Sequence, residues 1–313
     1  MGPDKIDDLS NDWRIKTHHC LQKKIFMKLK SKGLRGVGYL ERALKIFIKL
    51  PEVHGPVLVR IENNLLIRVD PLSDFGLEKN IFETGTYEAG TLNLIKKLLR
   101  PGDCFVDAGA NIGLMSLVAA RAVGPTGSVY SFEPEPAVHS TLKYNVELNG
   151  LAQIKTFNLA LGSKREQKTI HKHVQHNRGG ATLVSKENSF ERIPVMVDTL
   201  DNIIAANSIE HVKLLKIDVE GWESEVLAGS TALLASKSAP IIILEYPQKK
   251  EPAKKIYNFL TNTGNYEIYS FVGNKNVISP LRKVSGEQTL PRGDNIVCML
   301  SSQRQSLPGE LFV

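Results

Sequence analysis

Short apolar runs alternate with longer segments of helical periodicity from Gly102 onward. "DCFVDAG" precedes "NIGLMSLVAARAVG", and "GSVYSFE" precedes "PAVHSTLKYNVELNG", whose final Asn149-Gly150 is typical of a helix C-cap. A strand that is repeatedly followed by a helix implies parallel strands joined by right-handed crossovers. The chain is therefore expected to form an α/β fold, with a mostly parallel sheet and helices on both of its faces.

The alternation is interrupted once and then continues to the end of the chain. "QIKTFNLALG" supplies a third strand, and the polar stretch from Ser163 to Pro194 is interpreted as inserted strands and a loop. The second half contains the strands "KLLKIDVE" and "APIIILEYP", a helix near Pro252 to Asn262, and finally "YEIYSFVG" and "NIVCML". Because the last two strands can pair as a hairpin, we expect the sheet to have an antiparallel edge.

The N-terminal region differs from this core. "KKIFMKLKSKGLRG" and "ERALKIFIKL" carry apolar residues at helical spacing among many lysines, which predicts two basic amphipathic helices. They could contact an anionic membrane or a polyanion, or dock on the main domain with solvated lysines outward; docking is the commoner role of such helices.

The stretch "GPVLVRIENNLLIRVD" follows these helices and predicts a β-hairpin around Asn63-Asn64. The expected division is a basic helical extension over residues 1–54 and one domain over 55–313, with its core at 80–300. Removal of residues 1–50 is expected to leave the cofactor site intact.

Charge and cysteine usage limit the class of protein only loosely. The net charge of +7 over 313 residues, much of it near the N-terminus, is compatible with nucleic acid, an anionic membrane or a phosphorylated substrate. Three widely spaced cysteines without a CxxC pair indicate neither a disulfide framework nor a zinc site. With no signal-peptide pattern and no run of about 20 apolar residues, the expected location is the cytoplasm.

The first chemical motif is "FVDAGANIG", an apolar strand that ends in Asp107 and turns through Gly109 and Gly113 into a helix. Glycines at such a turn let the backbone approach a ligand beside the free N–H groups of the helix. The G-x-G-x-x-G pattern of dinucleotide sites is absent. Asp107 would repel a pyrophosphate but attract the cationic amino-acid end of S-adenosylmethionine. Glu133, which ends the next strand, is placed to accept hydrogen bonds from both ribose hydroxyls.

Several segments together resemble the FkbM family of S-adenosylmethionine-dependent methyltransferases: "FETGTYEAGT", "PGDCFVDAGANIGLMSLVAARAVGPTGSVYSFEPEP", "NVELNGL", "VDTLD", "LLKIDVEGWESEVLAGS" and "IIILEYP". The resemblance spans roughly residues 80 to 247. It implies a class I methyltransferase fold, which is Rossmann-like with a seven-stranded sheet, and methylation of a hydroxyl on a sugar, glycolipid, polyketide or other small molecule. It also implies that the cofactor contacts are Glu83, Tyr87, Asp107, Gly109, Ala110, Asn111, Gly113, Glu133, Pro134 and Ala160, with Glu88 as a further candidate beside Tyr87.

The stretch "KIDVEG" places three charges at every second position, at the end of an apolar strand. Methyl transfer to a hydroxyl requires a group that orients the oxygen and accepts its proton. Asp218 is the candidate general base or metal ligand, Lys216 would orient it or pair with the acceptor, and Glu220 adds a carboxylate on the same face. Glu245 ends the neighbouring strand, so that Asp218 and Glu245 form a candidate Mg²⁺ pair. The same charges could merely satisfy one another at the sheet edge.

Two other features could lie near the acceptor. Trp222 stands where many relatives carry a small residue, and it would narrow the acceptor pocket. "IHKHVQHN" contains His171, His173 and His176, but no carboxylate or cysteine nearby completes a metal site, so a solvated strand or an acceptor-contacting loop is the better interpretation.

Two rival functions stay open at this point. An RNA or protein methyltransferase would suit the positive charge, but the chain has no N-P-P-Y or D-P-P-Y tetrapeptide to hold an amino nitrogen and no RNA-binding aromatic pattern. A non-catalytic cofactor-binding protein of the same fold would need neither Lys216 nor Asp218. The expected partner is thus a small-molecule or saccharide acceptor and no specific nucleic acid.

Overall fold

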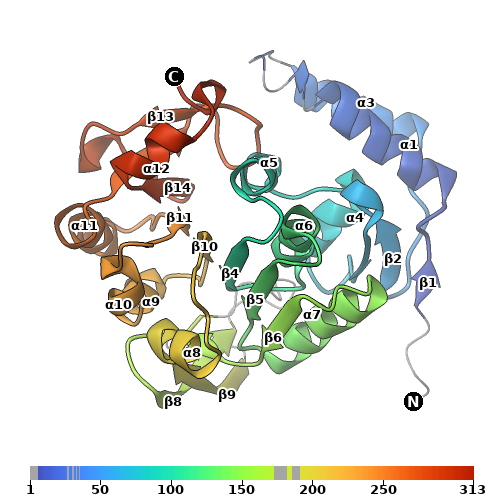
Figure 1. Ribbon diagram of the computed structural model, residues 1–313. Coiled ribbons are helices and arrows are strands. Elements are labelled where there is room, and N and C mark those ends of the chain that lie inside the picture. Colours follow the sequence, from blue (N-terminus) through green and yellow to red (C-terminus); the bar gives the residue numbers. More distant parts are fainter. Residues whose placement is uncertain are drawn as a thin grey trace.

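A mixed sheet of eight strands forms the centre of the protein in the computed structural model (Figure 1), which describes residues 6–26, 28–29, 32, 34, 36–172, 182–184 and 191–313. In sheet order the strands are β13 (Leu281–Lys283), β12 (Glu267–Phe271), β14 (Asn295–Met299), β11 (Ile241–Glu245), β10 (Leu214–Ile217), β4 (Cys104–Ala108), β5 (Ser128–Phe132) and β6 (Ile154–Phe157).

The sheet is parallel except at one edge. Strands β6, β5, β4, β10 and β11 pair in parallel, and β14 lies antiparallel between β11 and β12. The α/β class and the antiparallel edge are therefore confirmed. The short strand β13 pairs with β12 and makes eight strands where the family resemblance implied seven.

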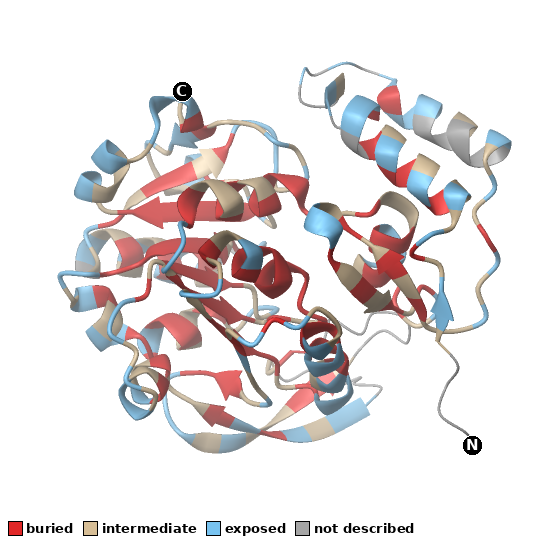
Figure 2. Ribbon diagram, turned by 45° about the vertical axis from the view of Figure 1, so that its right-hand side comes forward, coloured by how far each residue is buried: buried red, intermediate tan, exposed pale blue. Residues whose placement is uncertain are grey.

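Helices cover both faces of the sheet and separate two apolar cores. On one face lie α5 (Ala89–Leu98), α6 (Leu114–Val123) and α7 (Pro136–Leu148), and on the other lie α8 (Leu200–Ala206), α9 (Glu223–Ala228), α10 (Thr231–Ala235) and α11 (Lys250–Asn258). Every residue of β4 is buried, as expected for a parallel strand that packs on both faces. Figure 2 shows this continuous buried centre. The remaining helical segments near the C-terminal half are η4 (Phe259–Thr263), η5 (Glu287–Thr289), α12 (Ser301–Ser306) and η6 (Gly309–Leu311).

The polar excursion after β6 forms a second, smaller sheet. Its strands are β7 (Ala160–Leu161), β9 (Glu191–Asp198) and β8 (Glu166–Lys172), in that order. Strands β8 and β9 are antiparallel, and β7 pairs with β9 in parallel. The predicted inserted strands are thus present, and they lie at the same end of the main sheet as the carboxyl end of β5.

The predicted hairpin is formed by β2 (Val57–Arg60) and β3 (Leu66–Val69), with η2 (Glu62–Asn64) between them. Asn63 and Asn64 both have positive φ, the backbone that tight hairpin turns require. Asn145 on α7 and Asn149 at its C-cap exchange hydrogen bonds with the backbone of Arg68 and Leu66, respectively, which fastens β3 to the core.

The N-terminal extension packs on this hairpin. It contains β1 (Asp7–Asp8), α1 (Trp13–Leu21), η1 (Gln22–Phe26) and α3 (Val37–Phe47). Strand β1 pairs in parallel with β2, and the side chain of Ile15 is buried in the same apolar cluster as the hairpin. Nε2 of His18 lies 2.6 Å from the carbonyl oxygen of Ile48, which joins α1 to the end of α3. Within the residues described, no helix is long and apolar enough to cross a membrane.

Helix α1 also contacts α4 (Leu77–Thr84), the helix that precedes the candidate site. Nε2 of His19 donates a hydrogen bond to the carbonyl oxygen of Phe82 (3.0 Å). Gly85 ends α4 with φ +72°, and the chain then passes through Thr86 to Tyr87 and Glu88. The extension is therefore in contact with the segment that delivers these two residues to the site.

Candidate active site

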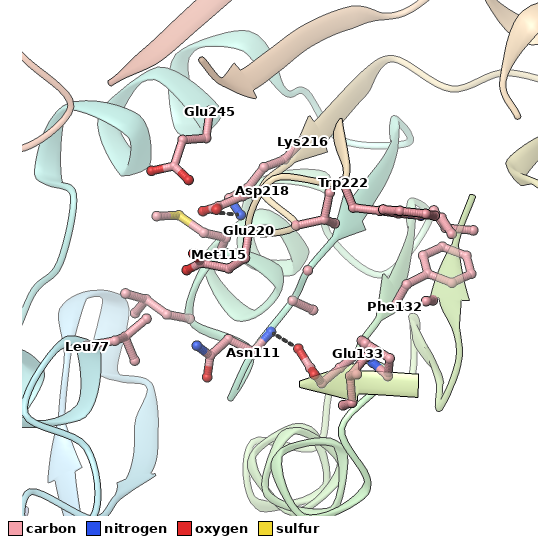
Figure 3. Close-up of a pocket in the computed structure, with 18 of the residues that line it drawn as sticks. Leu77, Asn111, Met115, Phe132, Glu133, Lys216, Asp218, Glu220, Trp222 and Glu245 are labelled. Carbon is pink, nitrogen blue, oxygen red and sulfur yellow. Dashed lines mark hydrogen bonds and ion pairs between the residues drawn. The ribbon is translucent and has the colours of Figure 1, made fainter. Parts of the chain in front are cut away.

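A cavity lies at the carboxyl ends of β4, β5, β10 and β11, where open α/β sheets bind their ligands (Figure 3). It is closed on one side by the turn between α4 and α5 and on the other by β7 and β8. Its wall contains most of the residues predicted from sequence: Tyr87, Glu88, Gly109, Ala110, Asn111, Glu133, Pro134, Ala160, Lys216, Asp218, Glu220, Trp222 and Glu245.

Gly109 fixes the turn that follows β4. Its N–H and that of Ala110 both donate to the carbonyl oxygen of Phe132, at 3.0 and 2.9 Å. Its φ is +80°, and a β-carbon here would lie 1.8 Å from the carbonyl oxygen of Asp218. Only glycine fits, because both the backbone conformation and the close approach exclude a side chain. The first motif is thereby held directly against the "KIDVEG" segment.

Glu133 lies at the end of β5 and is held by two backbone N–H groups. Asn111 donates to Oε2 (2.9 Å) and Glu135 donates to Oε1 (3.0 Å). Asn111 adopts the left-handed conformation, with φ 51°, which turns its N–H toward the carboxylate. Burial raises the pKa of Glu133 to about 7. Each carboxylate oxygen has a second lone pair, so the group can still accept hydrogen bonds from the hydroxyls of a ribose.

Lys216 and Asp218 form an ion pair at the end of β10, with 3.2 Å between Nζ and Oδ2. The lysine side chain is buried, whereas that of Asp218 is 24% exposed, toward the cavity. Burial acts to raise the pKa of Asp218, but the ammonium groups of Lys216 and Lys275 outweigh it and lower that pKa. Burial likewise acts to lower the pKa of Lys216, and the carboxylates of Asp218 and Asp107 outweigh it. Both groups are therefore charged at neutral pH.

Asp107 is fully buried behind this pair and does not line the cavity. Its Oδ2 accepts a hydrogen bond from the hydroxyl of Ser116 (2.6 Å), while its Oδ1 has no hydrogen-bond partner among the residues described and lies 3.7 Å from Nζ of Lys216. Burial raises its pKa. Asp107 is therefore separated from the cavity wall, with the ammonium of Lys216 as its neighbour, and its contact with the cofactor stays a prediction.

Glu220 lies beyond the end of β10, in a turn rather than on the strand. Its φ is 55° and that of Gly221 is 94°, and Oγ1 of Thr182 donates to the Glu220 carbonyl oxygen (2.6 Å). The sequence argument, which continued the strand through Glu220, is wrong about the conformation, although the side chain still lines the cavity. The partly desolvated cavity and the charges of Asp218 and Glu245 raise the pKa of Glu220, and water screens this effect because the side chain is exposed.

Glu245 and Glu88 share a lysine that the sequence did not reveal. Nζ of Lys275 lies 2.7 Å from Oε1 of Glu245 and 2.8 Å from Oε1 of Glu88. Nδ2 of Asn295 donates to the other oxygen of Glu88 (2.9 Å). Lys275 follows β12 in a surface loop with no motif around it, so only a prediction of which loop folds over the sheet edge could have found it.

Asp218 and Glu245 are the two carboxylates proposed to hold Mg²⁺. A hydrogen bond from Glu245 contributes to the lowered pKa of Asp218, and burial, followed by the charge of Asp218, raises the pKa of Glu245 to about 7. The pKa values of the two carboxyls are thus shifted in opposite directions, and Lys275 pairs with Glu245. In the described part of the chain, no three His, Cys, Asp or Glu side chains are grouped as metal ligands.

Most apolar residues of the cavity wall were not predicted from the sequence. Beyond Trp222 the wall contains Leu77, Leu114, Met115, Phe132, Leu159, Leu161, Ile170 and Leu183. These residues resemble any other core positions in the sequence, and periodicity alone does not show which of them face a cavity. The Trp222 ring stands on this wall, with its Nε1 buried and without a hydrogen-bond partner in the described residues.

Five further sequence candidates lie away from the cavity or outside the described residues. Gly113 is the left-handed N-cap of α6 and packs against Leu142, so that its role is in the turn. Glu83 is on α4 and does not line the cavity. His171 pairs with Thr182 through two backbone hydrogen bonds, and His173 and His176 lie outside the described residues.

The charge of the wall suits a cationic ligand. Six carboxylate side chains and two ammonium groups line the cavity. S-adenosylmethionine carries a sulfonium and an ammonium group, and its ribose can donate two hydrogen bonds to a carboxylate held as Glu133 is. The residues present therefore fit this cofactor at the turn after β4 and at the end of β5.

Comparison with known proteins gives the same class of enzyme. Residues 107–268 match the Methyltransferase FkbM domain. The methyltransferase sdnD of Sordaria araneosa is 28% identical over 202 residues, which cover 52% of this chain and 74% of that protein. The 31-O-demethyl-FK506 methyltransferase FkbM of Streptomyces tacrolimicus is 32% identical over 159 residues, which cover 42% of this chain and 60% of that protein.

A solved structure of a methyltransferase FkbM from Methylobacillus flagellatus is 15% identical, with a TM-score of 0.41; the match covers 70% of this chain and 52% of that one. Because this structural likeness is weak, the assignment depends on the match to the family domain, which spans more than half of the chain. The chain therefore belongs to the FkbM family of S-adenosylmethionine-dependent methyltransferases.

Proposed function

We propose that the protein transfers a methyl group to a hydroxyl oxygen of a small acceptor such as a sugar, a glycolipid or a polyketide alcohol. The observation that carries this proposal is the ionised carboxylate of Asp218, which is open to the cavity and held from behind by Lys216. A relative of this chain bears the name of an O-methyltransferase for FK506.

S-adenosylmethionine, when bound, supplies an electrophilic methyl group on its positively charged sulfur. Glu133 and the backbone around Gly109 to Asn111 would hold it, and the acidic wall favours its positive charge over a neutral molecule of the same shape. The apolar wall that includes Phe132, Met115 and Trp222 excludes water from the reacting atoms.

Asp218 acts on the acceptor hydroxyl. Its carboxylate accepts the hydrogen bond of the O–H group, which orients the oxygen, and then accepts the proton. The low pKa of Asp218 does not prevent this role, because an alcohol oxygen becomes strongly acidic as it gains a bond to carbon. Lys216 fixes the position of the carboxylate through the 3.2 Å contact to Oδ2.

The distribution of charge argues for a small acceptor rather than RNA. The cavity wall carries an excess of carboxylates, which would repel a phosphate backbone at the point of transfer. A small neutral alcohol meets no such penalty. A carboxylate partner also suits a hydroxyl acceptor, since the hydroxyl both donates the hydrogen bond and releases the proton.

Transfer of a radiolabelled methyl group tests the proposal. Purified protein is incubated with labelled S-adenosylmethionine and, separately, a set of alkyl glycosides, glycolipids, polyketide alcohols, total RNA and denatured protein. Label should enter the alcohols in an alkali-stable ether linkage and should be lost in Asp218→Asn. Incorporation into RNA or protein alone, in the absence of ether formation, would show that the hydroxyl assignment is wrong.

A further inference from the structure

The first 50 residues contain twelve Lys and Arg and only five Asp and Glu. The excess of seven equals the formal net charge of the whole chain, so the other 263 residues are balanced. The positive charge of this protein therefore belongs to the extension and not to the methyltransferase domain. A charge confined to one appendage indicates a partner for that appendage.

Large apolar side chains are exposed on the same segment. Of the thirteen exposed large apolar residues in the described ranges, six lie between residues 13 and 47: Trp13, Ile25, Leu34, Tyr39, Leu40 and Phe47. Phe47 is 85% exposed and Leu40 is 55% exposed. These two residues are seven positions apart on α3, so they lie on one side of the helix. Isolated exposed apolar residues are ordinary, but this density on one short segment is not.

The buried side of the extension packs against the rest of the protein. Ile15 packs with the hairpin, His19 contacts α4 and His18 contacts the end of α3, which leaves Trp13 and Lys16 outward. Figures 1 and 2 show α1 and α3 lying side by side at the end of the hairpin, away from the large sheet. Trp13, Ile25, Leu34, Leu40 and Phe47 are thus exposed on the extension, and none of them lines the catalytic cavity.

Exposed lysines stand among these apolar residues. Lys24 and Lys32 are exposed next to Ile25 and Leu34, and the 81% exposed side chain of Lys49 follows Phe47. Apolar side chains flanked by lysines on short helices are the combination that binds the interface of an anionic bilayer: the apolar groups enter the acyl boundary and the ammonium groups meet lipid phosphates. A nucleic acid would use the lysines but would leave Leu40 and Phe47 in water.

We propose that the N-terminal extension is a peripheral membrane anchor, which binds the surface of an anionic lipid bilayer through the exposed apolar residues of α1 and α3 and the exposed lysines Lys24, Lys32 and Lys49. The anchor does not depend on the identity of the acceptor. It places the cavity of the methyltransferase domain near a membrane, where lipid-linked acceptors are concentrated.

Vesicle flotation with the full-length chain tests the anchor. The protein should float with vesicles of phosphatidylcholine and phosphatidylglycerol and remain at the bottom with phosphatidylcholine alone. The double variant Leu40→Ser, Phe47→Ser should reduce the partition coefficient at least about tenfold, because two large apolar side chains are lost from the interface. The double variant Lys24→Gln, Lys32→Gln should reduce it roughly thirtyfold.

The matched control is Met196→Ser, Val272→Ser, which removes two exposed apolar residues from the methyltransferase domain and should float like the native chain. Circular dichroism and titration with S-adenosylmethionine establish that every variant is folded. The proposal is overturned if the native chain ignores anionic vesicles, if it instead binds a fluorescent RNA in a lysine-dependent manner without floating, or if Leu40→Ser, Phe47→Ser only abolishes a concentration-dependent dimer.

Discussion

The imidazole ring of His19 lies against the α-carbon of Gly85, so that a β-carbon on that glycine would stand 2.5 Å from Nδ1 of the histidine. Gly85 is the left-handed end of α4, and Tyr87 and Glu88 of the cavity wall follow it by two and three residues. The N-terminal extension therefore supports the wall of the catalytic cavity, although 66 residues separate the two partners.

Gly85→Ala should destabilise the protein and weaken cofactor binding. The φ of +72° alone costs an alanine about 1–3 kcal/mol, and the clash with His19 moves the turn that carries Tyr87 and Glu88. Urea denaturation and calorimetric titration with S-adenosylmethionine measure the two effects. Gly55→Ala is the control, because its β-carbon meets nothing within 4 Å. Equal behaviour of the two variants would contradict a supporting role for the His19 contact.

This contact bears on the division of the chain predicted from sequence. Because the motifs begin near residue 80, the sequence predicts that removal of the first 50 residues leaves the cofactor site intact. In the structure, β1 extends the hairpin sheet and His19 binds the carbonyl of Phe82. No sequence pattern links His19 to Gly85, because the contact between them is made by tertiary packing of distant segments.

Gly109→Ala should abolish cofactor binding. The added β-carbon would lie 1.8 Å from the Asp218 carbonyl oxygen, so the turn after β4 and the "KIDVEG" segment cannot both keep their places. Gly150→Ala separates this clash from backbone strain, since Gly150 also has a positive φ, of 61°, but no atom within 4 Å. We expect about 1 kcal/mol of destabilisation and unchanged binding for Gly150→Ala. Measurable binding of S-adenosylmethionine by Gly109→Ala would refute the predicted clash.

The pKa of Glu133, raised to about 7 by burial, predicts how stability changes with pH. The folded protein binds a proton at Glu133 more tightly than the unfolded chain does. The contribution of Glu133 to the free energy of unfolding is therefore complete below about pH 4.5 and is lost as the pH rises to about 7. Within that window the free energy of unfolding of the native chain should fall by up to about 1.4 kcal/mol per pH unit relative to Glu133→Gln. Urea unfolding between pH 5 and 8 measures the difference; parallel curves would mean that Glu133 is ionised throughout.

Sequence reasoning located the charges of the site better than their partners. Lys216 and Asp218 could be predicted because strand periodicity and the end of a parallel strand bring them to the ligand edge. The sequence predicts Glu220 on the same strand. In the structure Gly221 permits a turn at this point, and the turn sets the direction of the Glu220 side chain. Lys275 could not be predicted, since it reaches the site from a loop after β12 that has no recognisable motif.

Lys275→Met tests that missed contribution. The side chain is 15% exposed and lies between Glu88 and Glu245, so its loss leaves two carboxylates facing each other in the cavity wall. We expect a loss of roughly 3 kcal/mol in stability, as for other largely buried pairs that lose one partner. Lys283→Met removes a 59% exposed lysine paired with Glu267 and should cost less than about 1 kcal/mol. Chemical denaturation of both variants gives the comparison, and similar losses would argue against burial as the cause.

Asp218→Asn should preserve folding and cofactor affinity and lower kcat by roughly 10²–10⁴, the range expected when a positioned proton acceptor is lost. The amide keeps the shape of the strand end, but it cannot take the proton of the acceptor.

Glu245→Gln distinguishes two roles for the pair formed by Asp218 and Glu245. If the pair shares a proton, as the opposite pKa shifts of Asp218 and Glu245 indicate, glutamine still donates a hydrogen bond to Asp218 and activity falls only a fewfold. If the pair holds Mg²⁺, both variants fail, and a chelator inactivates the native enzyme, because a hard cation needs both carboxylates. We expect the first outcome, since the ammonium of Lys275 lies 2.7 Å from Oε1 of Glu245, where it opposes a second cation. Native turnover in Asp218→Asn would mean that the charges of "KIDVEG" serve only the fold.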